Sequence, residues 1–182
     1  MRKHFILFSI LFLLNSCGVI VMNGLSDDYN KLTDEQKAMV VSFKPDQPTD
    51  KNKIYVITAS ELKQEVKKYP KALVYTFANS CSSEFCKPLY VYENWAKEND
   101  YKLFLVMVSY ANIEETLLQN TPSQLYVIDS NYYGNGPFGK YVGYFQNELK
   151  GLKYNAKEDW NGGLFFFKNG EFVNNLNELP KN

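Results

Sequence analysis

Two apolar runs separated by a helical pattern constrain the fold of this chain more than any other feature. The runs are KALVYTF (71–77) and YKLFLVMVSY (101–110), and each is apolar at consecutive rather than alternate positions. Such runs are typical of strands buried on both faces, as in parallel sheets that helices cover on either side. The stretch between them, up to about Asn99, has the pattern of a helix. The two runs are therefore expected to be adjacent, parallel, central strands.

The rest of the chain continues this alternation of strand and helix. Further strands are expected at 53–58 and 123–129. Helices are expected between residues 58 and 70, where Thr58 and Glu61 have the spacing of a capping box, between 112 and 119, where Asn112 can act as the cap, and around 142–149. The segment GLFFFKNGEFV (163–173) contains Asn169-Gly170, the strongest short signal for a β-hairpin. The pattern predicts an α/β fold, in which a mixed central sheet lies between two layers of helices.

The first residues have the layout of a secretory signal. Two basic residues precede the apolar stretch 5–14, and LNSC (14–17) follows it. This sequence resembles the lipobox of bacterial lipoproteins, which implies cleavage before Cys17 and attachment of lipid to its sulfur. A signal-anchor helix is the alternative, because the mostly apolar run from Phe5 to Met22 has the length of a membrane span. Both interpretations place the rest of the chain outside the cytoplasm.

The lipobox interpretation divides the chain into three parts. Residues 1–16 would be a lipoprotein signal peptide, 17–52 a tether with a short helix and a linker, and 53–182 the folded domain. Thr33 and Gln36 have the spacing of a capping box, which predicts a short helix within TDEQKAMVVSF (33–43). The protein would then lie in the cell envelope, held to the lipid bilayer through Cys17 and facing the periplasm or the cell exterior.

The composition excludes several kinds of chemistry. The only histidine is His4 and the only arginine is Arg2, both within the expected signal peptide. Without histidine there is no Cys-His or Ser-His-Asp site and no histidine zinc site, and two cysteines alone are a poor metal site. Removing Arg2 and Lys3 from the 20 basic residues leaves 18, against 20 acidic residues. This balance gives no electrostatic basis for binding nucleic acid, and we expect no metal and no cofactor.

Cys81 and Cys86 remain as an even pair if lipid occupies Cys17. Disulfides persist outside the cytoplasm, and the pair follows the strand 71–77, where open α/β sheets carry their active sites. We expect a reversible disulfide that exchanges with a protein thiol or disulfide, with Cys81 as the attacking thiol and Cys86 as the resolving one. A permanent structural bridge in a binding module is the alternative.

The spacing of the two cysteines sets a geometric condition. Five residues of a regular helix rise ~7.5 Å and turn by ~140°, whereas bridged Cα atoms rarely lie more than ~7 Å apart. Pro88 is tolerated at the start of a helix and disrupts its interior. Either the helix begins at Lys87 or Pro88, so that both cysteines precede it, or it begins near Ser82 and is kinked at Pro88.

The arrangement from Lys53 to Val173 resembles the thioredoxin-like fold, in the form found in membrane-tethered extracytoplasmic proteins of bacteria. The likeness rests on the cysteines after the second buried strand, on Thr121-Pro122 before a strand, and on the closing hairpin. It implies that Pro122 is cis and packs against the active-site cysteine. In thioredoxins the hairpin directly follows this proline, whereas roughly forty residues intervene here. Either 130–162 is an insertion, or 123–129 is an extra strand and Gly163 takes the place of the proline.

The segment CSSEFC (81–86) also resembles the C-T-x-E-x-C segment of bacterioferritin-comigratory-type peroxiredoxins. That resemblance implies a peroxidatic Cys81 and a resolving Cys86. These enzymes have a proline seven residues, and a Thr or Ser three residues, before the peroxidatic cysteine, where this chain has Val74 and Ala78. They also need an arginine, which the mature chain lacks. Thiol–disulfide exchange is therefore the expected activity, with a redox-inactive binding module and an atypical peroxidase as alternatives.

Overall fold

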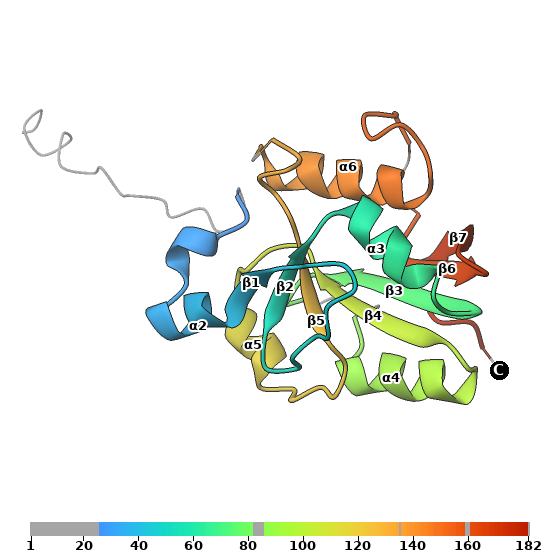
Figure 1. The fold of residues 1–182 in the computed structure, drawn as a ribbon, viewed down its shortest axis with the longest axis horizontal. Helices are drawn as coiled ribbons and strands as arrows, with labels where there is room; N and C mark the ends of the chain where they lie inside the picture. Colours follow the sequence, from blue (N-terminus) through green and yellow to red (C-terminus); the bar gives the residue numbers. More distant parts are fainter. Residues whose placement is uncertain (1–25, 82–85, 135, 159–160, 182) are drawn as a thin grey trace, which may run out of the picture.

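Strands β3 (Lys71–Phe77) and β4 (Lys102–Met107) lie side by side and run parallel at the centre of a mixed sheet, as their apolar runs predict (Figure 1). The computed structural model describes residues 26–81, 86–134, 136–158 and 161–181. Every residue of β3 after Lys71 is buried, as expected for a strand that helices cover on both faces.

Seven strands make up the sheet. Their order is β1 (Val40–Ser42), β2 (Ile54–Ile57), β5 (Leu125–Ile128), β4, β3, β6 (Leu164–Lys168) and β7 (Glu171–Leu176). The first five strands in this order are parallel, whereas β6 is antiparallel to β3 and β7 to β6. The predicted hairpin is confirmed, and its turn residues Asn169 and Gly170 both have positive φ, at 49° and 81°, as the favoured two-residue hairpin turn requires.

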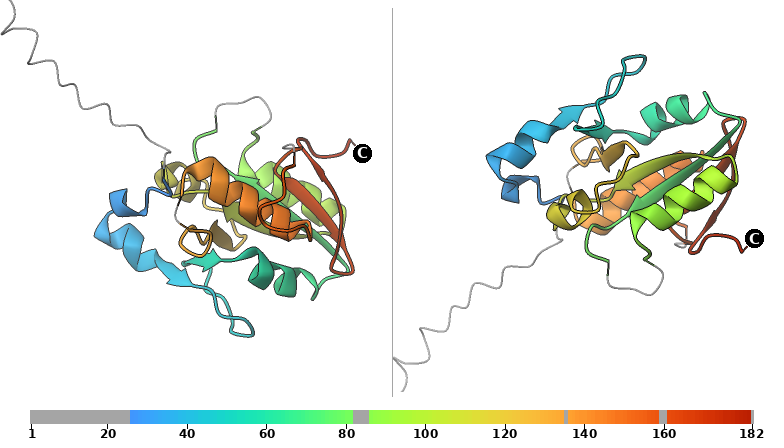
Figure 2. Two further views of the ribbon diagram at one scale, coloured as in Figure 1. Left: turned by 90° about the horizontal axis from the view of Figure 1, so that it is seen from above. Right: turned by 90° about the horizontal axis from the view of Figure 1, so that it is seen from below.

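Helices pack on both faces of the sheet, and each face has its own apolar core (Figures 1 and 2). Helices α3 (Ala59–Val66) and α6 (Phe138–Leu149) cover one face. Helices α4 (Leu89–Glu98) and α5 (Ile113–Leu117) cover the other. The predicted arrangement of a mixed sheet between helices is thus present. Within the described residues, no helix has the length and apolar character needed to cross a membrane.

Capping boxes start two of the helices where the sequence predicts them. Thr33 caps α2 (Asp34–Met39) together with Gln36, and Thr58 caps α3 together with Glu61. In both, the threonine hydroxyl accepts the backbone N–H of the partner residue, and an oxygen of the partner's side chain accepts the threonine N–H. These reciprocal bonds satisfy amides that a helix end leaves unpaired.

The sheet begins earlier in the chain than the predicted domain boundary at residue 53. Residues 40–42 form β1, which pairs with β2, and Phe43 is buried in the core on the α3 and α6 face. A short 3-10 helix, η2 (Tyr29–Lys31), precedes α2, and Leu32 is buried in the opposite core. The segment expected to be a tether therefore joins the domain from residue 26 onwards, because its apolar side chains complete both cores.

Candidate functional site

Cys81 and Cys86 are joined by a disulfide, with their Cα atoms 5.9 Å apart. Helix α4 starts only at Leu89, and Pro88 is its N-cap residue. Both cysteines therefore precede the helix, which agrees with the first of the two alternatives for Pro88. Cys81 is exposed and Cys86 is half-buried, so a partner can reach Cys81 more easily.

The pair lies at the carboxyl edge of the parallel strands, with Cys81 four residues beyond the end of β3. The buried side chain of Asn79 holds the loop that leads to it. Its amide nitrogen donates to the carbonyls of Ser109 and Ala111, both at 2.9 Å, and its amide oxygen accepts from Thr116 Oγ1 at 2.7 Å. One side chain thus joins the loop after β3 to the loop after β4 and to α5.

A second side-chain contact supports the same loop. Asn112 occupies the N-cap position of α5 and was expected to cap it, but the structure shows no capping bond from its side chain. Its backbone is left-handed, with φ at 53°, and its amide donates instead to the hydroxyl of Ser80. The two residues before Cys81 are therefore both bonded to the segment that connects β4 to α5.

An uncharged cavity of about 440 Å³ adjoins the disulfide. Its walls come from the end of β3 and the loop after it, from the residue after β4, from α6, and from the residues just before β6 and just after β7. None of the described residues that line it carries a formal charge, and they are Tyr75, Thr76, Phe77, Ala78, Cys81, Cys86, Val108, Phe138, Val142, Gln146, Gly163 and Asn177. The cavity therefore suits an uncharged, mostly apolar group next to the sulfurs.

Gly163 allows the strands to approach closely beside this cavity. Its carbonyl accepts the N–H of Thr76 at 2.8 Å, and a Cβ added at Gly163 would lie 2.5 Å from the carbonyl oxygen of Thr76. Any larger residue would push β6 and β3 apart at this point. Gln146 of α6 donates to Thr76 Oγ1 at 3.1 Å, which fixes the helix wall of the cavity to the same position of the sheet.

Two stacked tyrosines connect the cavity with the residue after Cys86. The rings of Tyr75 and Tyr92 have centroids 4.0 Å apart, and the Tyr92 hydroxyl accepts the backbone N–H of Lys87 at 3.3 Å. Burial, helped by the contact with Tyr92, raises the pKa of Tyr75 well above its ordinary value. Tyr75 is consequently a neutral phenol at physiological pH and adds no charge to the cavity.

Pro122 does not lie beside the cysteines, where the resemblance to thioredoxins would place it. It precedes β5 at the amino end of that strand, while Cys81 follows the carboxyl end of β3. Because β3, β4 and β5 are parallel, the two residues are at opposite edges of the sheet. No peptide bond in the described residues is cis. Gly163 is instead among the residues that line the disulfide cavity, and β5 lies between β4 and β2.

Sequence reasoning missed the residues that position the loop and wall the cavity. Asn79, Thr76 and Gln146 are ordinary polar residues in the sequence, and only their partners across the fold distinguish them.

Cys17 lies outside the described residues, and the described ones include no cluster of three or more His, Cys, Asp or Glu side chains suited to a metal ion. Comparison of the chain with models of protein families, with curated proteins and with solved structures finds no match.

Proposed function

We propose that this protein is a membrane-anchored, extracytoplasmic thiol–disulfide exchange protein with a thioredoxin-like core. The observation that supports it most is the placement of an accessible disulfide at the carboxyl edge of a central parallel strand, ahead of a helix and beside an uncharged cavity. Active sites of open α/β sheets lie at this edge.

The likeness to thioredoxins concerns one part of the sheet. The unit β3–α4–β4 is parallel, the hairpin β6–β7 is antiparallel on the other side of β3, and the cysteines lie between β3 and α4. The additional strand β5 accounts for the long segment between Thr121-Pro122 and the hairpin. In this interpretation Gly163, directly before β6, takes the place that a cis-proline has in the family.

Exchange would begin when a thiolate of a reduced partner attacks the exposed sulfur of Cys81. A mixed disulfide forms between the partner and Cys81, the bond between Cys81 and Cys86 breaks, and Cys86 leaves as a thiolate. The second partner thiolate then attacks the mixed disulfide and releases Cys81. Two electrons pass from the partner, which becomes a disulfide, to the protein, which becomes a dithiol. The amino end of α4, which begins three residues after Cys86, favours the thiolate that each step releases.

The reduction potential of the pair tests this proposal. The protein is equilibrated with glutathione or dithiothreitol buffers of graded potential, and free thiols at Cys81 and Cys86 are counted. We expect a value above about −300 mV, the region of exchangeable disulfides. A lower value would support the alternative of a binding module in which the bridge only stabilises the loop. The double variant Cys81→Ser/Cys86→Ser is the control, because it keeps the cavity and loses the chemistry.

Membrane attachment is tested separately at Cys17. We expect the mature protein to carry lipid on Cys17 and to fractionate with membranes, and Cys17→Ala to be unprocessed or released. Mass spectrometry that finds an unmodified amino terminus beyond residue 17 would contradict the proposal of a lipid anchor.

A further inference from the structure

A second cavity lies at the carboxyl edge of the sheet, at the ends of β4 and β5. Its volume is about 440 Å³, and none of its described lining residues also lines the disulfide cavity. The two strands are parallel neighbours, but α5, which follows β4, packs on one face of the sheet and α6, which follows β5, packs on the other. Open α/β sheets bind their ligands in the crevice between two strands whose connections diverge in this way.

The residues that enter the domain form one wall of this cavity. The carbonyl of Asp27 accepts the N–H of Tyr110, which follows β4, at 2.7 Å. The carboxylate of Asp27 accepts the hydroxyl of Ser130, which follows β5, and the N–H of Tyr29 at 3.1 Å. Asp27 therefore bridges the ends of the two strands and fixes the entering segment beside the crevice.

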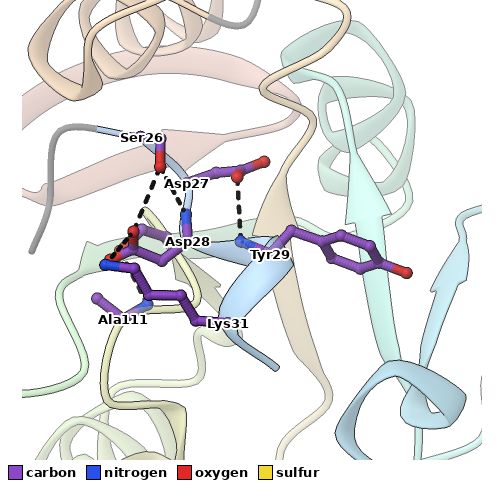
Figure 3. A network of polar contacts seen from close by, with 7 residues as sticks. Ser26, Asp27, Asp28, Tyr29, Lys31 and Ala111 are labelled. Atoms are coloured by element: carbon purple, nitrogen blue, oxygen red, sulfur yellow. Dashed lines mark hydrogen bonds and ion pairs between the residues drawn. The ribbon is translucent and has the colours of Figure 1, made fainter. Parts of the chain in front are cut away.

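The charges of the entering segment are divided between its two sides. Figure 3 shows the side chains of Asp27 and Tyr29 directed to one side, and those of Asp28 and Lys31 to the other. Asp28 and Lys31 form an ion pair at 3.0 Å away from the cavity, whereas Asp27 and Tyr29 line it. The second acidic residue of the cavity is Asp129, directly after β5. The described lining residues include no Lys, Arg or His, so the cavity is formally negative.

Three side chains of the cavity can accept further hydrogen bonds. A carboxylate accepts about four, whereas from the described residues Asp27 accepts two and Asp129 one. Tyr110 is only 5% exposed, yet its hydroxyl bonds to no described residue, although buried tyrosine hydroxyls usually have a partner. Burial raises the pKa of Tyr110 well above its ordinary value, and the charges of Asp27 and Asp129 add to the increase. The hydroxyl is therefore a neutral phenol near both carboxylates, and its oxygen can accept a hydrogen from a ligand.

The remaining walls are suited to the apolar part of a ligand. The ring of Tyr29 meets that of Tyr110 edge-on, with centroids 5.3 Å apart, and a tyrosine ring face attracts a cation. Aliphatic side chains of β1, β2 and β5 complete the lining, and they are Val40, Val41, Val56 and Ile128. A calcium ion takes about six to eight oxygen ligands, which apolar walls do not supply. The volume and the mixed lining are instead those of a site for a small organic molecule.

We propose that this cavity binds a small organic cation, in which an ammonium group is attached to an apolar body. The ammonium group would donate to Asp27, Asp129 and the Tyr110 hydroxyl, and the apolar body would lie against Tyr29 and the aliphatic wall. The inference does not depend on thiol–disulfide exchange, because the two cavities share no described lining residue.

Three probes of one size and different charge test the proposal. Benzylammonium, benzyl alcohol and benzoate are each titrated into the purified, oxidised protein, and binding is followed by the amide NMR signals of Asp27, Tyr110, Asp129 and Ser130. We expect benzylammonium to bind about tenfold more tightly than benzyl alcohol, because hydrogen bonds to charged groups are the stronger ones, and benzoate not to bind. Equal affinity for benzylammonium and benzyl alcohol, or no response of these amides to benzylammonium, would overturn the proposal. Calcium chloride is a fourth probe, and a response to calcium but not to benzylammonium would make this a metal site instead.

Variants then locate the charge that binds the probe. Asp129→Asn should weaken benzylammonium binding about tenfold, and Tyr110→Phe, which keeps the ring, should weaken it several-fold. Glu171→Gln on the exposed edge strand β7 changes the net charge equally and should have no effect. An equal loss at Glu171 would show that only the overall charge attracts the probe. Circular dichroism checks the fold of each variant, and if Asp129→Asn does not fold, unchanged binding by Tyr110→Phe would still contradict the site.

The double variant Cys81→Ser/Cys86→Ser separates this site from the proposed exchange activity. It should bind benzylammonium as tightly as the unchanged protein. A loss of binding in a correctly folded double variant would show that the cavity depends on the disulfide, and the claim of an independent site would fail.

Discussion

Asn79→Ala should destabilise the domain although Asn79 is a polar residue that belongs to neither apolar core cluster. The change removes three hydrogen bonds, two to carbonyls and one from the Thr116 hydroxyl, and Thr116 is fully buried. Each such bond contributes about 1 kcal/mol, and a buried group left without a partner costs 1–3 kcal/mol. We expect a loss of about 3 kcal/mol in the free energy of unfolding. For a domain of this size each kcal/mol lowers Tm by roughly 2–4 °C, so Tm should fall by roughly 10 °C.

Urea denaturation followed by circular dichroism measures this loss, in both the oxidised and the reduced protein. The loss should be similar in the two forms, because Asn79 bonds to the β4–α5 segment and not to the cysteines. Asn174→Ala on the exposed edge strand β7 is the matched control, and it should change stability by less than about 0.5 kcal/mol. A loss at Asn79 no larger than the loss at Asn174 would show that the loop after β3 does not depend on these bonds.

Three further changes probe the surroundings of the disulfide and the core. Replacing Cys81 and Cys86 by serine should cost about 2 kcal/mol of stability in urea denaturation, the chain-entropy value for so small a ring; no loss would mean that the bridge does not constrain the unfolded chain. Gly163→Ala should cost about 1–3 kcal/mol because the new Cβ would meet the Thr76 carbonyl 2.5 Å away. Gly143→Ala in α6, where a Cβ meets nothing within 4 Å, should instead gain up to about 1 kcal/mol, and equal effects at the two glycines would refute the close approach. Stability should fall above about pH 10, because unfolded tyrosines ionise near pH 10 while burial raises the pKa of Tyr75, Tyr110, Tyr126, Tyr133 and Tyr141 in the folded protein. Phenolate absorbance that accounts for all 14 tyrosines without loss of structure would contradict this.

Local patterns in the sequence were sufficient to predict most elements of the fold. The apolar runs at 71–77 and 101–110 predict the central parallel strands, because strands buried on both faces have no polar positions. The capping boxes at Thr33 and Thr58 and the hairpin turn at Asn169-Gly170 form through contacts within four residues, so their sequence signals suffice. Pro88 limits α4 to two possible starts, since proline is tolerated at a helix start and disrupts a helix interior, and the structure has the start just after Pro88.

Only the tertiary structure decides which elements become neighbours, because pairing in a parallel sheet depends on contacts between residues far apart in the chain. Both β5 and β6 read as strands in the sequence, but the cores place β5 between β2 and β4, so that Pro122 lies at the edge away from Cys81 and Gly163 lies beside the cavity. The short strand β1 was predicted as part of a helix, because the partner that makes it a strand, β2, begins twelve residues after β1 ends. The role of Asn79 depends on carbonyls thirty or more residues away, which no local pattern around residue 79 can indicate.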